Sequence, residues 1–158
     1  MKVNRKTIAG ISAVIGAAAG LAVPLVSAWE GIRARPYKDP VGISTVCYGE
    51  TSAEMRPYSP QECKDMLNRA ITQRYGPDVL KCTPGIGDYP GAFAAAISLA
   101  YNIGPTAYCR STAARKFQQG DLKGGCDAFA LWVKAGGRVL PGLVNRREAE
   151  IEMCHAAI

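Results

Sequence analysis

The hydrophobic pattern of the chain begins with an uninterrupted apolar run. Residues 7–29 contain no charged side chain and follow Lys2, Arg5 and Lys6. The run is long enough to cross a bilayer as a helix, and the basic residues before it predict a cytoplasmic N-terminus. Glycine and alanine dominate the run, and Pro24 interrupts it. Because burial energy scales with apolar area, such a helix binds lipid weakly for its length.

Three interpretations of this segment are open: a cleaved signal peptide, a permanent anchor and a releasable anchor. Val26-Ser27-Ala28 resembles a small-residue cleavage site, the length of the run favours an anchor, and its small side chains favour release. Cleavage after Ala28 would leave Glu30 beside a new N-terminus with no helix to hold it. Since a catalytic group needs a rigid support, we expect the segment to be retained if Glu30 is catalytic.

After the apolar run, the pattern changes twice. Residues 33–57 are rich in proline and glycine and contain short alternating runs, which predicts short antiparallel strands joined by turns. From Ser59, an N-cap serine, a proline and a glutamate predict a helix that runs to about Tyr75. A loop is expected over 83–88. Further helices are predicted over 90–103, from 111 or 112 to 117, over 121–133 and over about 141–156, with breaks at 104–105 and 136–137.

This order of elements is typical of the α+β class. One N-terminal helix precedes a small antiparallel sheet lobe and then a helical bundle lobe, with a cleft expected between the lobes. The chain shows no internal repeat and no second globular unit. We therefore divide it into residues 1–29, a weakly hydrophobic membrane segment, and residues 30–158, one folded domain.

Composition narrows the possible partners. The 158 residues are 48% hydrophobic and 20% charged, which is typical of a globular protein. The net charge of +6 favours nucleic acid, anionic lipid or an anionic wall polymer as a partner, and it is equally compatible with simple solubility. Nucleic-acid binding is the weakest of these interpretations, because the basic residues are scattered and no binding motif accompanies them.

The cysteines favour a disulfide framework in an oxidising compartment. No two of them lie within a few positions of each other and the single histidine, His155, is near the C-terminus, so we expect neither a zinc site nor another metal or cofactor. Spacing alone leaves their pairing open. The six are Cys47, Cys63, Cys82, Cys109, Cys126 and Cys154.

A candidate catalytic group consists of Glu30, Asp39 and Thr45. Glu30 would end the first helix, Asp39 would lie in the turn entering the sheet, and Thr45 would lie on a strand, so the three can face one cleft. Hydrolysis of a glycosidic bond needs an acid for the leaving oxygen and a second group that directs water or attacks. A glutamate beside the apolar Trp29 can keep its proton, an aspartate among polar turn residues stays ionised, and a hydroxyl can hold the water. The spacing alone also arises by chance.

The residues around this triple closely resemble the active-site region of the phage lysozymes, glycoside hydrolase family 24. The resemblance covers roughly residues 29–156. Its motifs are Glu30-Gly-Ile-Arg33, Pro36-Tyr37-Lys38-Asp39, Gly42-Ile-Ser-Thr45, Tyr48-Gly49, the helix start at Ser59–Asn68, Tyr101-Asn102-Ile103-Gly104, Gly120-Asp121 and Asn145-Arg146-Arg147-Glu148.

This resemblance implies hydrolysis of the β-1,4 bond between N-acetylmuramic acid and N-acetylglucosamine in peptidoglycan. It implies that Glu30 is the general acid and that Asp39 directs the water with help from Thr45, with inversion at the anomeric carbon. It places Tyr101 and Asn102 in the family's cleft motif as substrate-binding residues.

Two of the implied roles have plainer alternatives. Asn102 precedes Gly104 and can cap a helix there, which is compatible with substrate contact. Arg146 matches the arginine that pairs with the catalytic glutamate, but it can also form an ordinary helix pair with Glu150 four positions on.

The front end resembles the signal-anchor-release endolysins within this family. That resemblance implies insertion through the secretion machinery, an inactive state at the periplasmic face of the inner membrane held by residues 7–29, and later release to the periplasm. We expect a monomer. Some members carry a cysteine in place of the aspartate. This chain has Asp39 there, so we expect topology, rather than disulfide exchange, to control activity.

The family fold also suggests which cysteines pair. Cys126 with Cys154 would join neighbouring bundle helices, Cys82 with Cys109 would flank the alanine-rich helix, and Cys47 with Cys63 remain.

Two other functions compete with hydrolysis. A lytic transglycosylase acts on the same bond with one acidic residue, but Asp39 and Thr45 in register favour water as the nucleophile. A non-enzymatic membrane-tethered wall-binding or membrane-disrupting module would explain the charge and the anchor, and Glu30 would then be a plain helix-end carboxylate.

Overall fold

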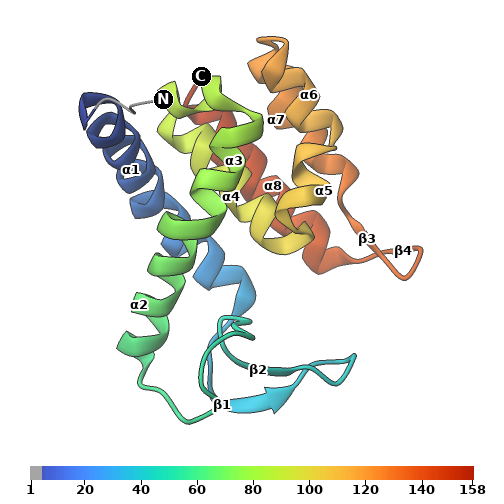
Figure 1. Cartoon of the computed structure of the whole chain (residues 1–158). Coiled ribbons are helices and arrows are strands. Elements are labelled where there is room, and N and C mark those ends of the chain that lie inside the picture. Colours follow the sequence, from blue (N-terminus) through green and yellow to red (C-terminus); the bar gives the residue numbers. More distant parts are fainter. Residues whose placement is uncertain (1–4) are drawn as a thin grey trace.

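The computed structural model describes residues 5–158, and the first four residues, including Lys2 of the basic flank, lie outside this range. Helix α1 (Arg5–Glu30) runs down one side of the molecule to a small sheet of β1 (Arg33–Lys38) and β2 (Ser44–Cys47), which lies at the bottom of the view in Figure 1. The rest of the chain forms a helical lobe. The α+β organisation expected from the pattern is therefore confirmed.

Helix α1 packs against the bundle with a narrow face of small side chains. The buried positions recur every three or four residues, as expected for one stripe of a helix. They are Ile15, Ala18, Ala19, Ala22 and Val26. The opposite side of α1 is exposed, and Ala9–Glu30 is also long and apolar enough to cross a membrane, a property that core helices and signal sequences share.

The two strands pair antiparallel, with Tyr37 opposite Thr45 and Lys38 opposite Ser44. A tight turn at residues 39–43 joins them, and Gly42 in this turn has a φ of 84°, which suits a residue without a β-carbon. The pairing is irregular between Arg33 and Tyr37. The sheet lobe thus consists of one hairpin and the loop that follows it.

The helix that begins at Ser59 is longer than the sequence suggested. Helix α2 (Pro60–Ala70) begins with a complete capping box between Ser59 and Glu62 and continues through a π turn, η1 (Ile71–Tyr75), into α3 (Gly76–Cys82). The predicted end near Tyr75 was wrong, because the π turn carries the helix on through Gly76 and Pro77 into α3. A β-carbon at Gly76 would lie 2.8 Å from the carbonyl oxygen of Ile71, so this turn requires glycine.

The remaining elements build the helical lobe around α4 (Pro90–Ile103), whose residues 91–100 are all buried. Both α1 and α8 (Pro141–Ala156) pack on α4. The other elements are η2 (Pro84–Asp88), α5 (Pro105–Cys109), α6 (Thr112–Gln118), α7 (Leu122–Asp127), η3 (Ala128–Leu131), β3 (Lys134–Ala135) and β4 (Arg138–Val139).

Two local expectations need correction, and a third is confirmed. The loop expected over 83–88 contains a 3-10 turn. Helix α4 ends at Ile103, at the break expected for Gly104-Pro105, and a further short helix, α5, begins at Pro105. The helix expected over 121–133 ends as α7 at Asp127, continues as a 3-10 turn and gives way to the β3–β4 hairpin around Gly136-Gly137. At 84–88 and at 136–137, prolines and glycines shape a local turn of the chain.

Three disulfide bonds connect the elements, and they are the pairs that the resemblance suggested. Cys47 is bonded to Cys63 between β2 and α2, Cys82 to Cys109 between α3 and α5, and Cys126 to Cys154 between α7 and α8. The Cys47–Cys63 bond links the sheet lobe directly to α2.

Candidate active site

Glu30 is the last residue of α1, and the fold holds its side chain at the end of this helix. Gly31 follows with a φ of 65° and turns the chain toward β1, as a helix-ending glycine does. The Glu30 side chain is 24% exposed, and its Oε1 accepts a hydrogen bond from Nη1 of Arg146 at 2.6 Å. The apolar Trp29, expected beside Glu30, is 36% exposed, and the charged partner of the Glu30 carboxylate is the guanidinium of Arg146.

Arg146 belongs to a buried network on α8. Its Nε contacts Oε1 of Glu150 at 3.2 Å, and its Nη2 donates to the carbonyl oxygen of Ser98 at 3.2 Å. The structure therefore contains both pairs that the sequence left open for Arg146, one with Glu30 and one with Glu150. The Ser98 hydroxyl donates to Glu150 Oε1 at 2.6 Å.

Arg147 extends the same network to Asn102 at the end of α4. Its Nη1 donates to Oδ1 of Asn102 at 3.0 Å, and its Nη2 donates to Glu150 at 2.9 Å. Asn102 thus receives a side-chain partner from α8, and the helix cap after it is Gly104. Burial raises the pKa of Glu150 above its usual range, against the opposing effect of Arg147, and burial also lowers the pKa of Arg147.

Asp39 and Thr45 meet at the peptide groups of Ile43 in the β-hairpin. Asp39 Oδ1 accepts hydrogen bonds from the backbone amides of Val41 at 3.0 Å and Ile43 at 2.8 Å. Thr45 is buried, and its hydroxyl donates to the carbonyl oxygen of Ile43 at 3.0 Å. One oxygen of Asp39 therefore maintains the turn. Its Oδ2 has no hydrogen-bond partner within residues 5–158.

The structure joins only some of the predicted site residues to one another. Glu30 is bonded to Arg146, and Asp39 and Thr45 share Ile43, but no hydrogen bond among the described residues connects Glu30 to Asp39 or Thr45. Sequence reasoning passed over Ser98 and Arg147 and saw Glu150 only as a helix partner. The adjacent arginines at 146 and 147, each three or four positions from a glutamate, were the available signal.

Tyr101 lies near Glu30 and contacts the sheet lobe. Its hydroxyl donates to the carbonyl oxygen of Tyr48 in the sheet lobe, and its ring lies 4.7 Å from the ring of Tyr75 on η1. Burial raises the pKa of Tyr101, and the charge of Glu30 adds to this effect. Tyr101 therefore bridges the helical lobe and the sheet lobe close to the candidate acid.

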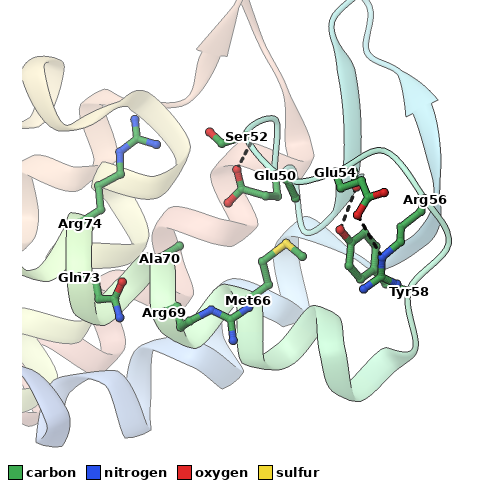
Figure 2. A pocket seen from close by; sticks show the side chains of 11 residues that line it. Glu50, Ser52, Glu54, Arg56, Tyr58, Met66, Arg69, Ala70, Gln73 and Arg74 are labelled. Atoms are coloured by element: carbon green, nitrogen blue, oxygen red, sulfur yellow. Dashed lines mark hydrogen bonds and ion pairs between the residues drawn. The ribbon is translucent and has the colours of Figure 1, made fainter.

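A groove of about 510 Å³ lies between the loop after β2 and the continuous helix formed by α2 and η1 (Figure 2). Glu50, Glu54 and Arg56 line it from the loop, and Arg69 and Arg74 line it from α2 and η1. The charge of Glu50 acts on both Tyr75 and Tyr101, as does that of Glu30, so the groove adjoins the candidate site. Polar groups of this kind suit a carbohydrate better than an apolar ligand. Within the described residues, no group of three or more acidic, histidine or cysteine side chains is arranged to hold a metal ion.

Comparisons with known proteins show the family of the chain. A family model described as phage lysozyme matches residues 27–150, and the chain belongs to this family. Its relatives include the SAR-endolysin of Bacteriophage PS119, 36% identical over 91% of this chain and 90% of the relative. Another is the SAR-endolysin of Enterobacteria phage P21, 36% identical over 95% of this chain and 94% of the relative.

Solved structures show the same fold. The active form of the P1 phage endolysin Lyz superposes with a TM-score of 0.75 at 24% identity, covering 94% of this chain and 93% of that one. A P22 lysozyme mutant gives a TM-score of 0.71 at 23% identity, covering 85% of this chain and 95% of that one. Family, relatives and fold together support a lysozyme-type endolysin.

Proposed function

We propose that the protein hydrolyses the β-1,4 bond between N-acetylmuramic acid and N-acetylglucosamine in peptidoglycan and so lyses a bacterial host. The observation that carries this proposal is the 2.6 Å ion pair between Glu30 and Arg146. It fixes one partly exposed carboxyl group at the junction of α1 and the sheet lobe, beside a polar groove. The family supplies the substrate class, since lysozymes act on peptidoglycan.

The proposed mechanism assigns one task to each residue. Glu30 gives its proton to the glycosidic oxygen as the bond to the anomeric carbon breaks. Oδ2 of Asp39 takes a proton from a water whose oxygen bonds to that carbon from the opposite face, so the configuration inverts. The Thr45 hydroxyl accepts a hydrogen bond from this water, because its own proton is directed at Ile43. Tyr101 and Asn102 contact the sugar.

Replacement of Asp39 by asparagine tests the second task without disturbing the turn. The amide oxygen of asparagine can still accept from Val41 and Ile43, whereas the charge at Oδ2 is lost. We expect kcat on soluble peptidoglycan strands to fall by about a hundredfold with little change in KM. Asp88→Asn, on an exposed aspartate of η2, is the matched control and should keep full activity. An Asp39→Asn enzyme as fast as wild type would remove Asp39 from the mechanism.

Product analysis separates hydrolysis from the alternative transglycosylase reaction. Hydrolysis adds one water to each cleaved bond, whereas a transglycosylase leaves an anhydro sugar that is lighter by one water. Mass spectrometry of fragments formed in ¹⁸O-labelled water should show one heavy oxygen at each new reducing end. Fragments with anhydro ends would assign the second reaction, and no cleaved bonds at all would assign the non-enzymatic wall-binding module.

We also propose that residues 1–29 first hold the enzyme in the inner membrane and that residues 30–158 form its catalytic domain. The names of the SAR-endolysin relatives and the apolar character of α1 support this division. In this proposal the secretion machinery inserts the segment, the tethered enzyme is inactive at the periplasmic face, and the released enzyme is a periplasmic monomer. Glu30 ends the same helix, so anchoring α1 in lipid would withhold the acid from the site.

A further inference from the structure

One buried carboxylate, Glu150, lies behind two groups of the candidate site. Its side chain is 0% exposed, and it contacts the guanidinium groups of both Arg146 and Arg147. Arg146 reaches from Glu150 to Glu30, and Arg147 reaches from Glu150 to Asn102. Through these two arginines, the fully buried Glu150 is linked to Glu30, the proposed acid, and to Asn102, the proposed sugar contact.

Stability alone does not account for this arrangement. Removing a carboxylate and two guanidinium groups from water costs free energy that their attraction barely repays, and apolar side chains of similar size often serve a core equally well. The fit is also imperfect, because Arg147 Nε lies 2.7 Å from Glu150 Oε2 without forming an aligned hydrogen bond. A costly network beside an active site indicates a functional role.

We propose that Glu150 is a positioning residue of the reaction, an inference that rests on the proposed function. It holds Arg146 against Glu30 and Arg147 against Asn102, so a single carboxylate fixes the acid and the sugar-binding amide together. The Ser98 hydroxyl, which donates to Glu150 at 2.6 Å, fixes the carboxylate in turn.

The charge of Glu150 matters as well as its geometry. Arg146 divides its contacts between two carboxylates, Nη1 to Glu30 and Nε to Glu150. Without the charge of Glu150, Glu30 would be the one carboxylate partner left to Arg146 among the described residues. The charge of Glu30 also acts on Arg147 of α8, Tyr101 of α4 and Tyr75 of η1. Glu50, after β2, acts on the same two tyrosines, and all four groups remain in the variant.

The experiment compares Glu150→Gln with Glu148→Gln, which changes an exposed glutamate on the same helix. Glutamine keeps the size of the side chain and removes its charge. On soluble peptidoglycan strands we expect Glu150→Gln to lower kcat by about a hundredfold, as misplacement of a catalytic group does. We expect KM to rise a few-fold through Asn102, and we expect the alkaline limb of its pH–kcat profile to move to lower pH, because the positive charge of Arg146 then acts on one carboxylate instead of two. Glu148→Gln should match wild type in all three.

A second variant keeps the charge and loosens the geometry, in case Glu150→Gln does not fold as judged by circular dichroism. Ser98→Ala removes the hydroxyl that holds Glu150, and we expect a smaller loss of kcat with the alkaline limb unmoved. A folded Glu150→Gln enzyme with wild-type kcat and pH profile would overturn the inference, as would an unaltered kcat in Ser98→Ala if Glu150→Gln is unfolded. Glu30→Gln on the same substrate tests the proposed function separately, because activity retained there would contradict the function itself.

Discussion

Glu30→Gln is expected to lower the rate of glycan cleavage by about a hundredfold to ten-thousandfold, the range that general acid catalysis supplies. Glutamine is nearly isosteric with glutamate, and its amide oxygen can still accept the hydrogen bond from Arg146 that the carboxylate accepts at 2.6 Å. What the variant lacks is the proton for the leaving oxygen. Because substrate contacts through Asn102 are untouched, KM should change little.

The measurement is the release of new reducing ends from purified peptidoglycan, followed beside a folding control. Glu152→Gln is a suitable matched variant, because Glu152 is an exposed glutamate near the end of α8 and does not line the groove. Both variants should give wild-type circular dichroism and unfolding midpoints. If Glu30→Gln releases reducing ends at the wild-type rate, the acid is another residue and the proposed mechanism fails.

The second large effect concerns release from the membrane. Gly10, Gly16 and Gly20 lie on the exposed side of α1, and a β-carbon at any of them would meet nothing within 4 Å. Three leucines there should leave the folded enzyme unchanged while adding apolar area that lipid can cover. At about 2 kcal/mol per buried leucine, the anchored state would gain roughly 6 kcal/mol, more than a thousandfold in the release equilibrium.

We therefore expect the triple leucine variant to remain in the membrane fraction of expressing cells and to fail to lyse them. The same protein, purified in detergent and assayed on isolated walls, should cleave at the wild-type rate. Three serines at the same positions form the control, since they add a β-carbon and almost no apolar area. Lysis at the wild-type time by a variant that stays in the membrane fraction would contradict control by topology.

How far the sequence predicts this molecule depends on whether the signals are local. The capping box at Ser59 and the buried helix over 90–103 are set by neighbouring residues, and the structure contains them. The turn at Asp39 is also present, but it joins β1 to β2, whereas the sequence predicted a turn that enters the sheet. The helix end expected near Tyr75 was wrong, because the helix continues through a π turn. That turn brings Gly76 close to the carbonyl oxygen of Ile71, and the spacing of hydrophobic residues does not predict such a contact.

The candidate site likewise contains residues that a local motif identifies and contacts that it does not. Glu30, Asp39 and Thr45 were chosen by motif, and a motif names residue types without their contacts. The network of Ser98, Arg147 and Glu150 joins α4 to α8, and its contacts span up to 52 positions of sequence between Ser98 and Glu150. Only the packing of these two helices brings such residues together, so no periodicity in either helix alone could assign their partners.

The buried face and the exposed face of α1 are subject to different evolutionary constraints. Ala18, Ala19 and Ala22 must stay small because they are buried where α1 packs on the helical lobe, so selection on folding should hold these positions nearly constant. The exposed positions meet no such neighbour, and only their summed hydrophobicity affects departure from lipid. We expect them to drift freely in identity while their total apolar content is conserved, so that one substitution toward leucine is accompanied by another toward glycine or serine.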